Sequence, residues 1–203
     1  LQDMLADLRQ APEIAVDTET TSLDPMQAEL VGLSFSVSPH TAYYVPLGHT
    51  GSGAPRQLPR KQTLTQIKML LEDLKVKKIG QNLKYDLLVL RHAGIELKGI
   101  SFDTMIASYL LNPSKASHGL DALALEYLNH KNISYAEVTG TGKKQIGFNE
   151  VDIETATRYS CEDADITLRL KLLLEPKLRE QRLESLFDDV EMKLMNVLAD
   201  MEY

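Results

Sequence analysis

The chain has 203 residues, 43% of them hydrophobic and 25% charged, with a formal net charge of −7 at pH 7. This apolar content is sufficient for a folded core and excludes a globally disordered chain. The single cysteine excludes a disulfide framework and a zinc site with several cysteine ligands. No apolar run approaches the roughly 18 residues of a membrane-spanning helix, and the first residues lack the pattern of a secretory leader. We therefore expect a cytoplasmic protein with no membrane partner.

The first half of the chain predicts mainly strands. Residues 2–10 have the spacing of a short amphipathic helix, and residues 13–20 (EIAVDTET) predict a buried strand that ends in polar groups. Two more strands are predicted over 30–37 and 41–48, which favours an antiparallel meander. Glycines and prolines in 51–61 predict a loop.

The second half predicts mainly helices. Apolar residues at helical spacing indicate a helix over 64–74, and a short strand follows at 77–82. Further helices are predicted over 83–93, 104–111, 119–129, about 150–179 and 183–203. Glycines at 140, 142 and 147 predict a flexible loop that carries two lysines. Strands followed by helices indicate an α/β or α+β domain. The chain starts at Leu1 and stops at Tyr203 within a helical pattern, so we expect it to be part of a longer protein.

Two carboxylates stand side by side at the end of the first predicted strand. Asp17 and Glu19 are two residues apart, so they point to the same face of the strand. Their repulsion costs stability unless a cation lies between them. Taken alone, such a pair is more often a solvated strand end.

Two further acids lie four residues from a polar partner, on one face of a helix. Asn82 precedes Asp86 in GQNLKYD, and Tyr159 precedes Asp163 in YSCED. A phenol one turn away from a carboxylate can hold a water molecule for attack. Each helix, taken alone, is more simply an ordinary surface helix.

The four acids together predict a more specific chemistry. Asp17, Glu19, Asp86 and Asp163 each follow an apolar stretch that can bring them inward. Oxygen ligands suit Mg²⁺ or Mn²⁺, and two such ions about 4 Å apart can clamp both oxygens of an in-line phosphoryl displacement. Net charge alone disfavours nucleic acid, but two divalent cations would bring the charge of these four acids near neutral.

At this point the sequence resembles a known family. DTETTSLD, GQNLKYD and YSCEDADIT are similar to the three motifs of the DEDD 3′–5′ exonucleases, and Tyr159 matches their tyrosine branch. Flanking segments such as QAELVGLSFSV, GIELKGISFDTM and GTGKKQIGFNE resemble the proofreading domain of bacterial family A DNA polymerases, of the polymerase I type. The resemblance covers about 1–203. It implies an α/β, ribonuclease H-like fold with a five-stranded mixed sheet flanked by helices. It also implies an exonuclease domain over 1–180 and a helix over 181–203 that leads toward a polymerase domain.

The resemblance assigns roles to the acids. Asp17, Glu19 and Asp163 are expected to hold one Mg²⁺, while Asp17 also reaches a second that Asp86 holds largely through water; Mn²⁺ is expected to substitute. Tyr159 is expected to orient the attacking water, with help from Glu19. Hydrolysis of the terminal phosphodiester would release deoxynucleoside 5′-monophosphates.

The resemblance also implies substrate-binding residues, namely Thr18, Leu23, Asn82, Tyr85 and Tyr135. Leu23 matches an apolar wedge between the last two bases, with packing in the core as its alternative. Tyr135 stands where the family has an aromatic residue that stacks on a base. Ser117 replaces a basic residue of the best-known member, which predicts a weaker phosphate contact.

The implied partners are the single-stranded 3′ end of DNA and a polymerase domain of the same longer chain. We expect a monomer in the bacterial cytoplasm, associated with the nucleoid through DNA. Unpairing costs least at a mismatch, which is the physical basis of proofreading. Two alternatives stay open: a catalytically silent, DNA-binding scaffold domain and a ribonuclease D-like RNA exonuclease. The presence of all four acids and Tyr159 favours an active enzyme.

Other signals are weaker. GTGKK (140–144) lacks the spacing of a phosphate-binding loop, and the five histidines lack metal-ligand spacing. Cys161 is expected to pack in the protein. Glu162 and Asp165 are expected to be solvated on other faces of their helix.

Overall fold

The computed structural model describes residues 1–51 and 54–203, so residues 52 and 53 of the predicted loop lie outside the described residues. One mixed sheet has the strand order β3-β2-β1-β4-β5. Its strands are β1 (Glu13–Thr20), β2 (Leu30–Ser38), β3 (Thr41–Pro46), β4 (Lys77–Gly80) and β5 (Ile100–Asp103). The first three strands pair antiparallel, which confirms the predicted meander, and β4 and β5 run parallel to β1.

The central strand β1 is apolar where the sheet is covered on both faces. Ile14, Ala15 and Val16 are buried, as a continuous apolar run at the centre of a sheet predicts. β4 pairs with β1 only from Glu13 to Ala15. The second half of β1, which carries the acids, therefore has β2 on one side and no strand partner among the described residues on the other.

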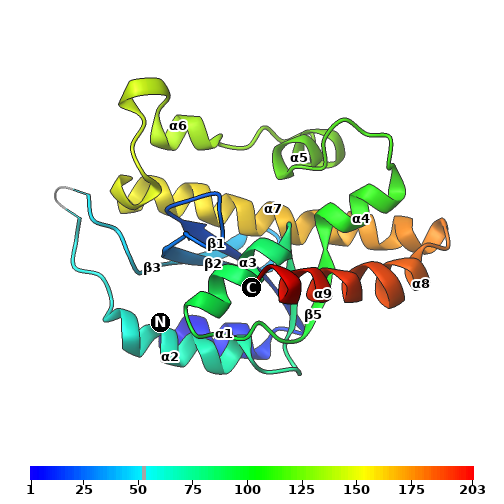
Figure 1. Cartoon of the computed structure of the whole chain (residues 1–203), viewed down its shortest axis with the longest axis horizontal. Coiled ribbons are helices and arrows are strands. Elements are labelled where there is room, and N and C mark those ends of the chain that lie inside the picture. The colour runs from blue at the N-terminus through cyan, green and yellow to red at the C-terminus, as the bar shows by residue number, and fades with distance from the viewer. Residues whose placement is uncertain (52–53) are drawn as a thin grey trace.

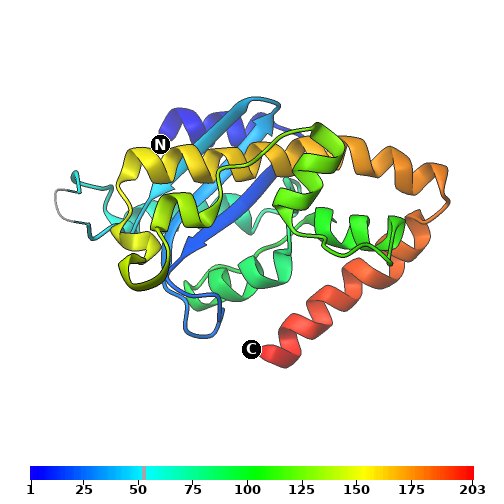
Figure 2. The same ribbon diagram turned by 90° about the horizontal axis from the view of Figure 1, so that it is seen from above.

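Helices cover both faces of the sheet (Figure 1; Figure 2). The long helix α7 (Ile153–Glu180) crosses one face and contacts β1, β2, β3 and β4, while α1 (Gln2–Gln10) and α2 (Arg60–Leu71) lie on the other side. The remaining helices are α3 (Leu83–His92), α4 (Thr104–Leu111), α5 (Leu120–Leu128), α6 (Tyr135–Thr139), α8 (Glu184–Leu186) and α9 (Met192–Glu202). Two 3₁₀ turns span Gly142–Lys144 and Phe148–Glu150, and a π-helical turn spans Phe187–Glu191.

The C-terminal segment is helical, as predicted, and packs on this domain with part of its apolar stripe. Phe187, Met192 and Met195 belong to the main core, and the ring of Phe187 lies 4.8 Å from that of Phe102. Val190 and Val197 are about half exposed. None of the helices in the described part of the chain has both the length and the apolar character that crossing a membrane requires.

Three local expectations from the residue pattern were wrong or incomplete. The edge strand β5 was missed because its four residues pair only with β4 and are too short for a periodic signal. Helix α6 was also missed. Helix α2 begins at Arg60, immediately after Pro59, so the preceding loop is shorter than predicted.

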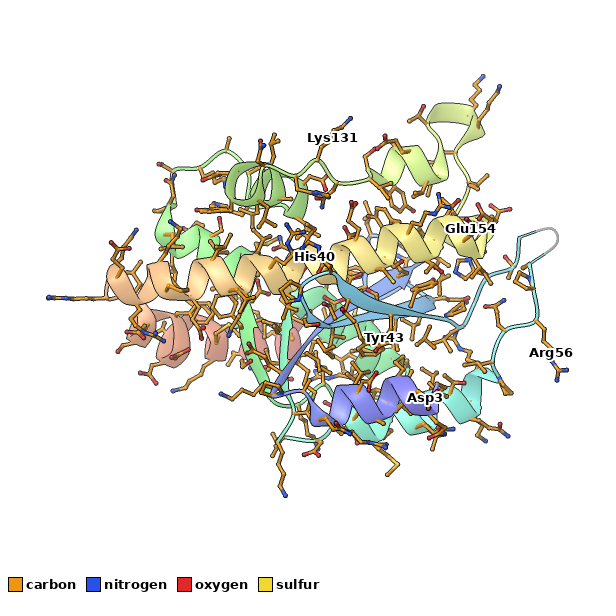
Figure 3. All side chains as sticks on the ribbon, turned by 180° about the vertical axis from the view of Figure 1, so that it is seen from behind. Asp3, His40, Tyr43, Arg56, Lys131 and Glu154 are labelled. Atoms are coloured by element: carbon orange, nitrogen blue, oxygen red, sulfur yellow. The ribbon has the colours of Figure 1, made fainter. Side chains whose placement is uncertain are left out.

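The expectation that Glu162 and Asp165 are solvated was wrong. Glu162 accepts hydrogen bonds from His130 Nε2 at 2.8 Å and from the amide of Ile133 at 2.6 Å. Asp165 is buried and accepts from the amide of His40, which Figure 3 shows beside α7 at the turn between β2 and β3. Both acids therefore attach neighbouring segments to α7.

Candidate active site

Three carboxylates meet between the central strand and α7. Asp17 and Glu19 project from β1, and Asp163 projects from α7; one carboxylate oxygen of each lies within 4.8 Å of those of the other two. Glu19 and Asp163 are buried, and Asp17 is half-buried. All three donors are oxygens, so the group fits a hard divalent cation such as Mg²⁺.

The fourth acid, Asp86, approaches from a different element. It lies in the first turn of α3, and its Oδ1 accepts from the hydroxyl of Thr18 at 2.6 Å and from the amide of Thr18 at 3.0 Å. Among the described acids it is outside the group of three but lines the same cavity, whose volume is about 350 Å³. The cavity brings together all ten residues that the family resemblance assigned to catalysis or substrate binding. Their individual roles stay predictions.

The crowding of these acids changes their proton affinity. Burial, reinforced by the charge of Asp163, raises the pKa of Asp17 to about 8. Burial also raises the pKa of Asp163 to about 8, although the Tyr159 phenol acts in the opposite sense. The pKa values of Glu19 and Asp86 are raised by burial and then by the charge of Asp17. The cluster is therefore unfavourable when fully ionised, and a bound cation would relieve the repulsion.

Aromatic rings form the wall beside Asp163. The ring of Tyr159 lies 5.7 Å from that of the fully buried Phe148 and 6.4 Å from that of Tyr135. Tyr135 stacks on Phe148 at 6.3 Å and is 42% exposed. One wall of the cavity therefore carries the partly exposed ring of Tyr135, which stacks on the buried ring of Phe148.

Leu23, the predicted wedge, also lines the cavity. Leu23 is 94% exposed, which excludes the alternative that it packs in the core. Its loop is attached to α3 because the hydroxyl of Tyr85 donates to the carbonyl of Ser22 and is also hydrogen-bonded to Thr20. A side chain that large and that exposed is available for contact with a ligand.

Asn82 lies where β4 leads into α3, and its backbone is left-handed with φ 60°. Asn is one of the few residues other than glycine that adopt this conformation readily. The nearby Asp103 accepts from the amides of Leu83, Met105 and Ile106, so one carboxylate caps the starts of α3 and α4. The polar residues Asn82 and Asp86 are thereby fixed relative to the sheet.

Comparison with known proteins places the chain in a family. A family profile described as 3′-5′ exonuclease, of the DNA polymerase A group, matches residues 1–179. The chain belongs to this 3′–5′ exonuclease family. DNA polymerase I of Pseudomonas aeruginosa is 46% identical over 201 residues, which cover 98% of the chain and 22% of the relative. The chain therefore spans about a fifth of the length of that curated relative.

Solved structures agree with the predicted fold. Brucella melitensis NrnC with bound Mg²⁺ is 26% identical with a TM-score of 0.63, over 97% of this chain and 84% of that one. Escherichia coli RNase D is 18% identical with a TM-score of 0.73, over 97% of this chain and 47% of that one, a likeness of fold. The exonuclease domain has the ribonuclease H-like fold that was predicted.

Several polar residues at the candidate site escaped the sequence reasoning. Gln81 and Gln145 line the cavity. Ser34 donates to Asp17 at 3.4 Å, and Ser160 donates to Glu19 at 2.6 Å. Gln81 directly precedes Asn82, which was a usable signal, whereas serines carry no distinguishing pattern.

Proposed function

We propose that this chain is a metal-dependent 3′–5′ exodeoxyribonuclease, the proofreading module of a DNA polymerase I. The observation that carries the proposal is the meeting of the Asp17, Glu19 and Asp163 carboxylates in a cavity that also contains Asp86 and Tyr159. The P. aeruginosa relative supports DNA rather than RNA as the substrate.

The four acids would hold two Mg²⁺ ions, with Mn²⁺ able to substitute. When bound, such ions promote deprotonation of a water molecule and neutralise charge on the phosphate and the leaving oxygen. The Mg²⁺ bound in the B. melitensis NrnC structure supports this choice of cation.

The protein's own side chains would orient the attacking water. Tyr159, which precedes Asp163 by one turn of α7 and lines the same cavity, would orient the attacking water toward the terminal phosphorus. Burial and the neighbouring acids raise the pKa of Tyr159, so its phenol stays protonated and can donate a hydrogen bond. Glu19 would assist in accepting the proton of that water. The products would be deoxynucleoside 5′-monophosphates.

The residues that line the cavity suit a single strand of DNA. Tyr135 would stack on a base and Leu23 would wedge between the last two bases. Asn82, Tyr85 and Thr18 line the same cavity and would lie near the terminal nucleotide. A paired end would first have to fray, and fraying costs least at a mismatch. The domain would act on DNA in the bacterial cytoplasm as a monomer, beside a polymerase domain of the same longer chain.

Two other functions are weaker. A silent scaffold domain has no need of the complete set of acids. A ribonuclease D-like activity has support in the fold alone, because the RNase D likeness is 18% identical.

The test is incubation of the domain with 5′-labelled DNA or RNA oligonucleotides of one sequence, with Mg²⁺. We expect a ladder that shortens from the 3′ end of DNA, and no ladder with Asp163→Ala. DNA that stays intact with both Mg²⁺ and Mn²⁺ supports the scaffold function, and faster loss of RNA supports the ribonuclease.

A further inference from the structure

The Glu19 carboxylate accepts a hydrogen bond from the buried hydroxyl of Ser160. Ser160 Oγ donates to Oε1 of Glu19 at 2.6 Å, across 141 positions of sequence. Ser160 has no exposed surface and Glu19 is 7% exposed, so water competes little with this bond. A carboxylate accepts several hydrogen bonds, so acceptor positions stay free for a cation.

Helix α7 gives Ser160 its position. Ser160 follows Tyr159 directly and precedes Asp163 by three residues, so it shares a helix face with Asp163. One turn earlier, Ala156 is fully buried. This small residue lets α7 approach the sheet, which brings a side chain as short as serine within reach of β1.

Tyr44, on β3, lies next to this part of α7. It packs against a small second core made of Val31, Phe148, Val151 and Ala156. Its phenol lies directly over Gly32, where a Cβ atom would be 2.2 Å from the phenolic oxygen. Gly32 is paired with Glu19 across β1 and β2, so the missing side chain lets the phenol extend across β2 toward Glu19.

His49 fixes the direction of the Tyr44 hydroxyl. Its Nδ1 lies 2.9 Å from the carbonyl oxygen of Val151, and its Nε2 lies 2.7 Å from the hydroxyl of Tyr44. A carbonyl can only accept, so Nδ1 carries the proton and Nε2 accepts from Tyr44. His49 is 5% exposed, and its amide and carbonyl are both bound by Gln57. The Tyr44 hydrogen is therefore directed to His49 and not to Glu19, and Ser160 supplies the side-chain hydrogen bond that Glu19 accepts.

We propose that Ser160 is a positioning residue that fixes the Glu19 carboxylate for cation binding. The proposal rests on the proposed function in one respect, the binding of a cation by Glu19. Among the described residues, the cavity lining does not include Ser160. Ser160 acts through Glu19, and loss of such an outer hydrogen bond typically costs about 10–100-fold in metal affinity.

The test is titration of the nucleic-acid-free domain with Mn²⁺ by calorimetry. We expect Ser160→Ala to weaken Mn²⁺ binding by about 10–100-fold. The matched control is Ser36→Ala, because Ser36 is equally buried and donates to the carbonyl of Thr41 at 2.8 Å, within the β2–β3 hairpin. Ser36→Ala should keep the wild-type affinity.

Tyr44→Phe is a second control. The Tyr44 hydroxyl donates to His49 and not to Glu19, so its loss should weaken Mn²⁺ binding by less than Ser160→Ala does. A loss as large as that of Ser160→Ala would contradict the role assigned to Ser160.

The failures are distinguishable. Equal Mn²⁺ affinities of a folded Ser160→Ala variant and the wild type overturn the positioning role and leave the proposed function in place. A wild-type domain that neither binds Mn²⁺ nor cleaves DNA overturns the proposed function, and this proposal with it.

Discussion

Thr18 donates both its hydroxyl and its backbone amide to the same oxygen of Asp86, at 2.6 and 3.0 Å. The amide is free to do so because β4 pairs with β1 only as far as Ala15. Since side chains alternate along a strand, Thr18 leaves β1 on the face opposite to Asp17 and Glu19. Asp86 therefore reaches the cavity around the unpaired edge of β1.

Thr18→Val tests this attachment, because valine keeps the shape of threonine and removes the hydroxyl. Asp86 would keep one of its two bonds from residue 18, so we expect a loss of about 1–2 kcal/mol in the free energy of unfolding. The exonuclease rate should fall by roughly tenfold, as Asp86 loses its fixed orientation. Urea unfolding and single-turnover cleavage measure the two effects. Thr18→Ser keeps the hydroxyl and is the control; equal behaviour of the two variants would contradict the prediction.

Leu23→Ala tests whether Leu23 contributes to substrate binding without contributing to the stability of the fold. Because Leu23 is 94% exposed, its truncation should change the free energy of unfolding by less than about 0.5 kcal/mol. If Leu23 wedges between bases, cleavage of a paired 3′ end should slow more than cleavage of a single strand, since the wedge assists fraying. The measurement is the ratio of the two rates. Leu58→Ala, at a side chain that is 44% exposed and outside the cavity lining, is the control. An unchanged ratio for Leu23→Ala would exclude the wedge.

The parts of the site that sequence reasoning found are those fixed by local geometry. Asp17 and Glu19 share a strand face, and Tyr159 and Asp163 share a helix face, so spacing alone predicted each pair. The four acids were grouped because each follows an apolar stretch and because oxygen ligands suit a divalent cation. The resemblance to polymerase exonucleases then assigned their individual roles and supplied the fifth strand, which local patterns did not.

The parts that sequence reasoning missed are tertiary. The bond from Ser160 to Glu19 spans 141 positions, and the bond from Thr18 to Asp86 spans 68. A serine that supports a carboxylate looks in sequence like any serine that packs in a helix. Pairing across such distances is set by how α7 and α3 sit on the sheet, which periodicity does not report.

Cation binding should stabilise the domain more strongly at higher pH. The folded-state pKa values of Asp17 and Asp163 are about 8, above the ordinary value of 3.8, so the folded state holds protons that the unfolded chain releases. The metal-free domain should therefore lose stability as the pH rises from about 4 to 8. Mn²⁺ competes with these protons, and at about 100 times its Kd it adds about 2.7 kcal/mol.

Thermal unfolding with and without Mn²⁺, at about pH 6 and about pH 8.5, measures this effect. We expect the larger Mn²⁺-induced rise in Tm at the higher pH. Asp163→Asn should remove most of the rise and, without metal, should be more stable than the wild type at the higher pH. A rise in Tm that is the same at both pH values would contradict the prediction.

Lys78→Met should stabilise the protein at neutral pH. Lys78 is fully buried in β4, and its Nζ donates to the carbonyl of Asp73 at 2.6 Å. Burial lowers its pKa from 10.5 to about 8. The unfolded chain therefore binds more protons between about pH 8 and 10.5, so wild-type stability should rise with pH over that range. Methionine has a similar length and no charge to bury, and we expect a gain of about 1–2 kcal/mol near pH 7.

Urea unfolding at about pH 7 and about pH 10 measures the gain, which should shrink at the higher pH, where the folded wild type buries a neutral amine. Lys77→Met is the matched control, because Lys77 is the preceding residue of the same strand and is exposed. That variant should differ little from the wild type at either pH. A gain for Lys78→Met that is equal at both pH values would show that it comes from packing and not from removal of a buried charge.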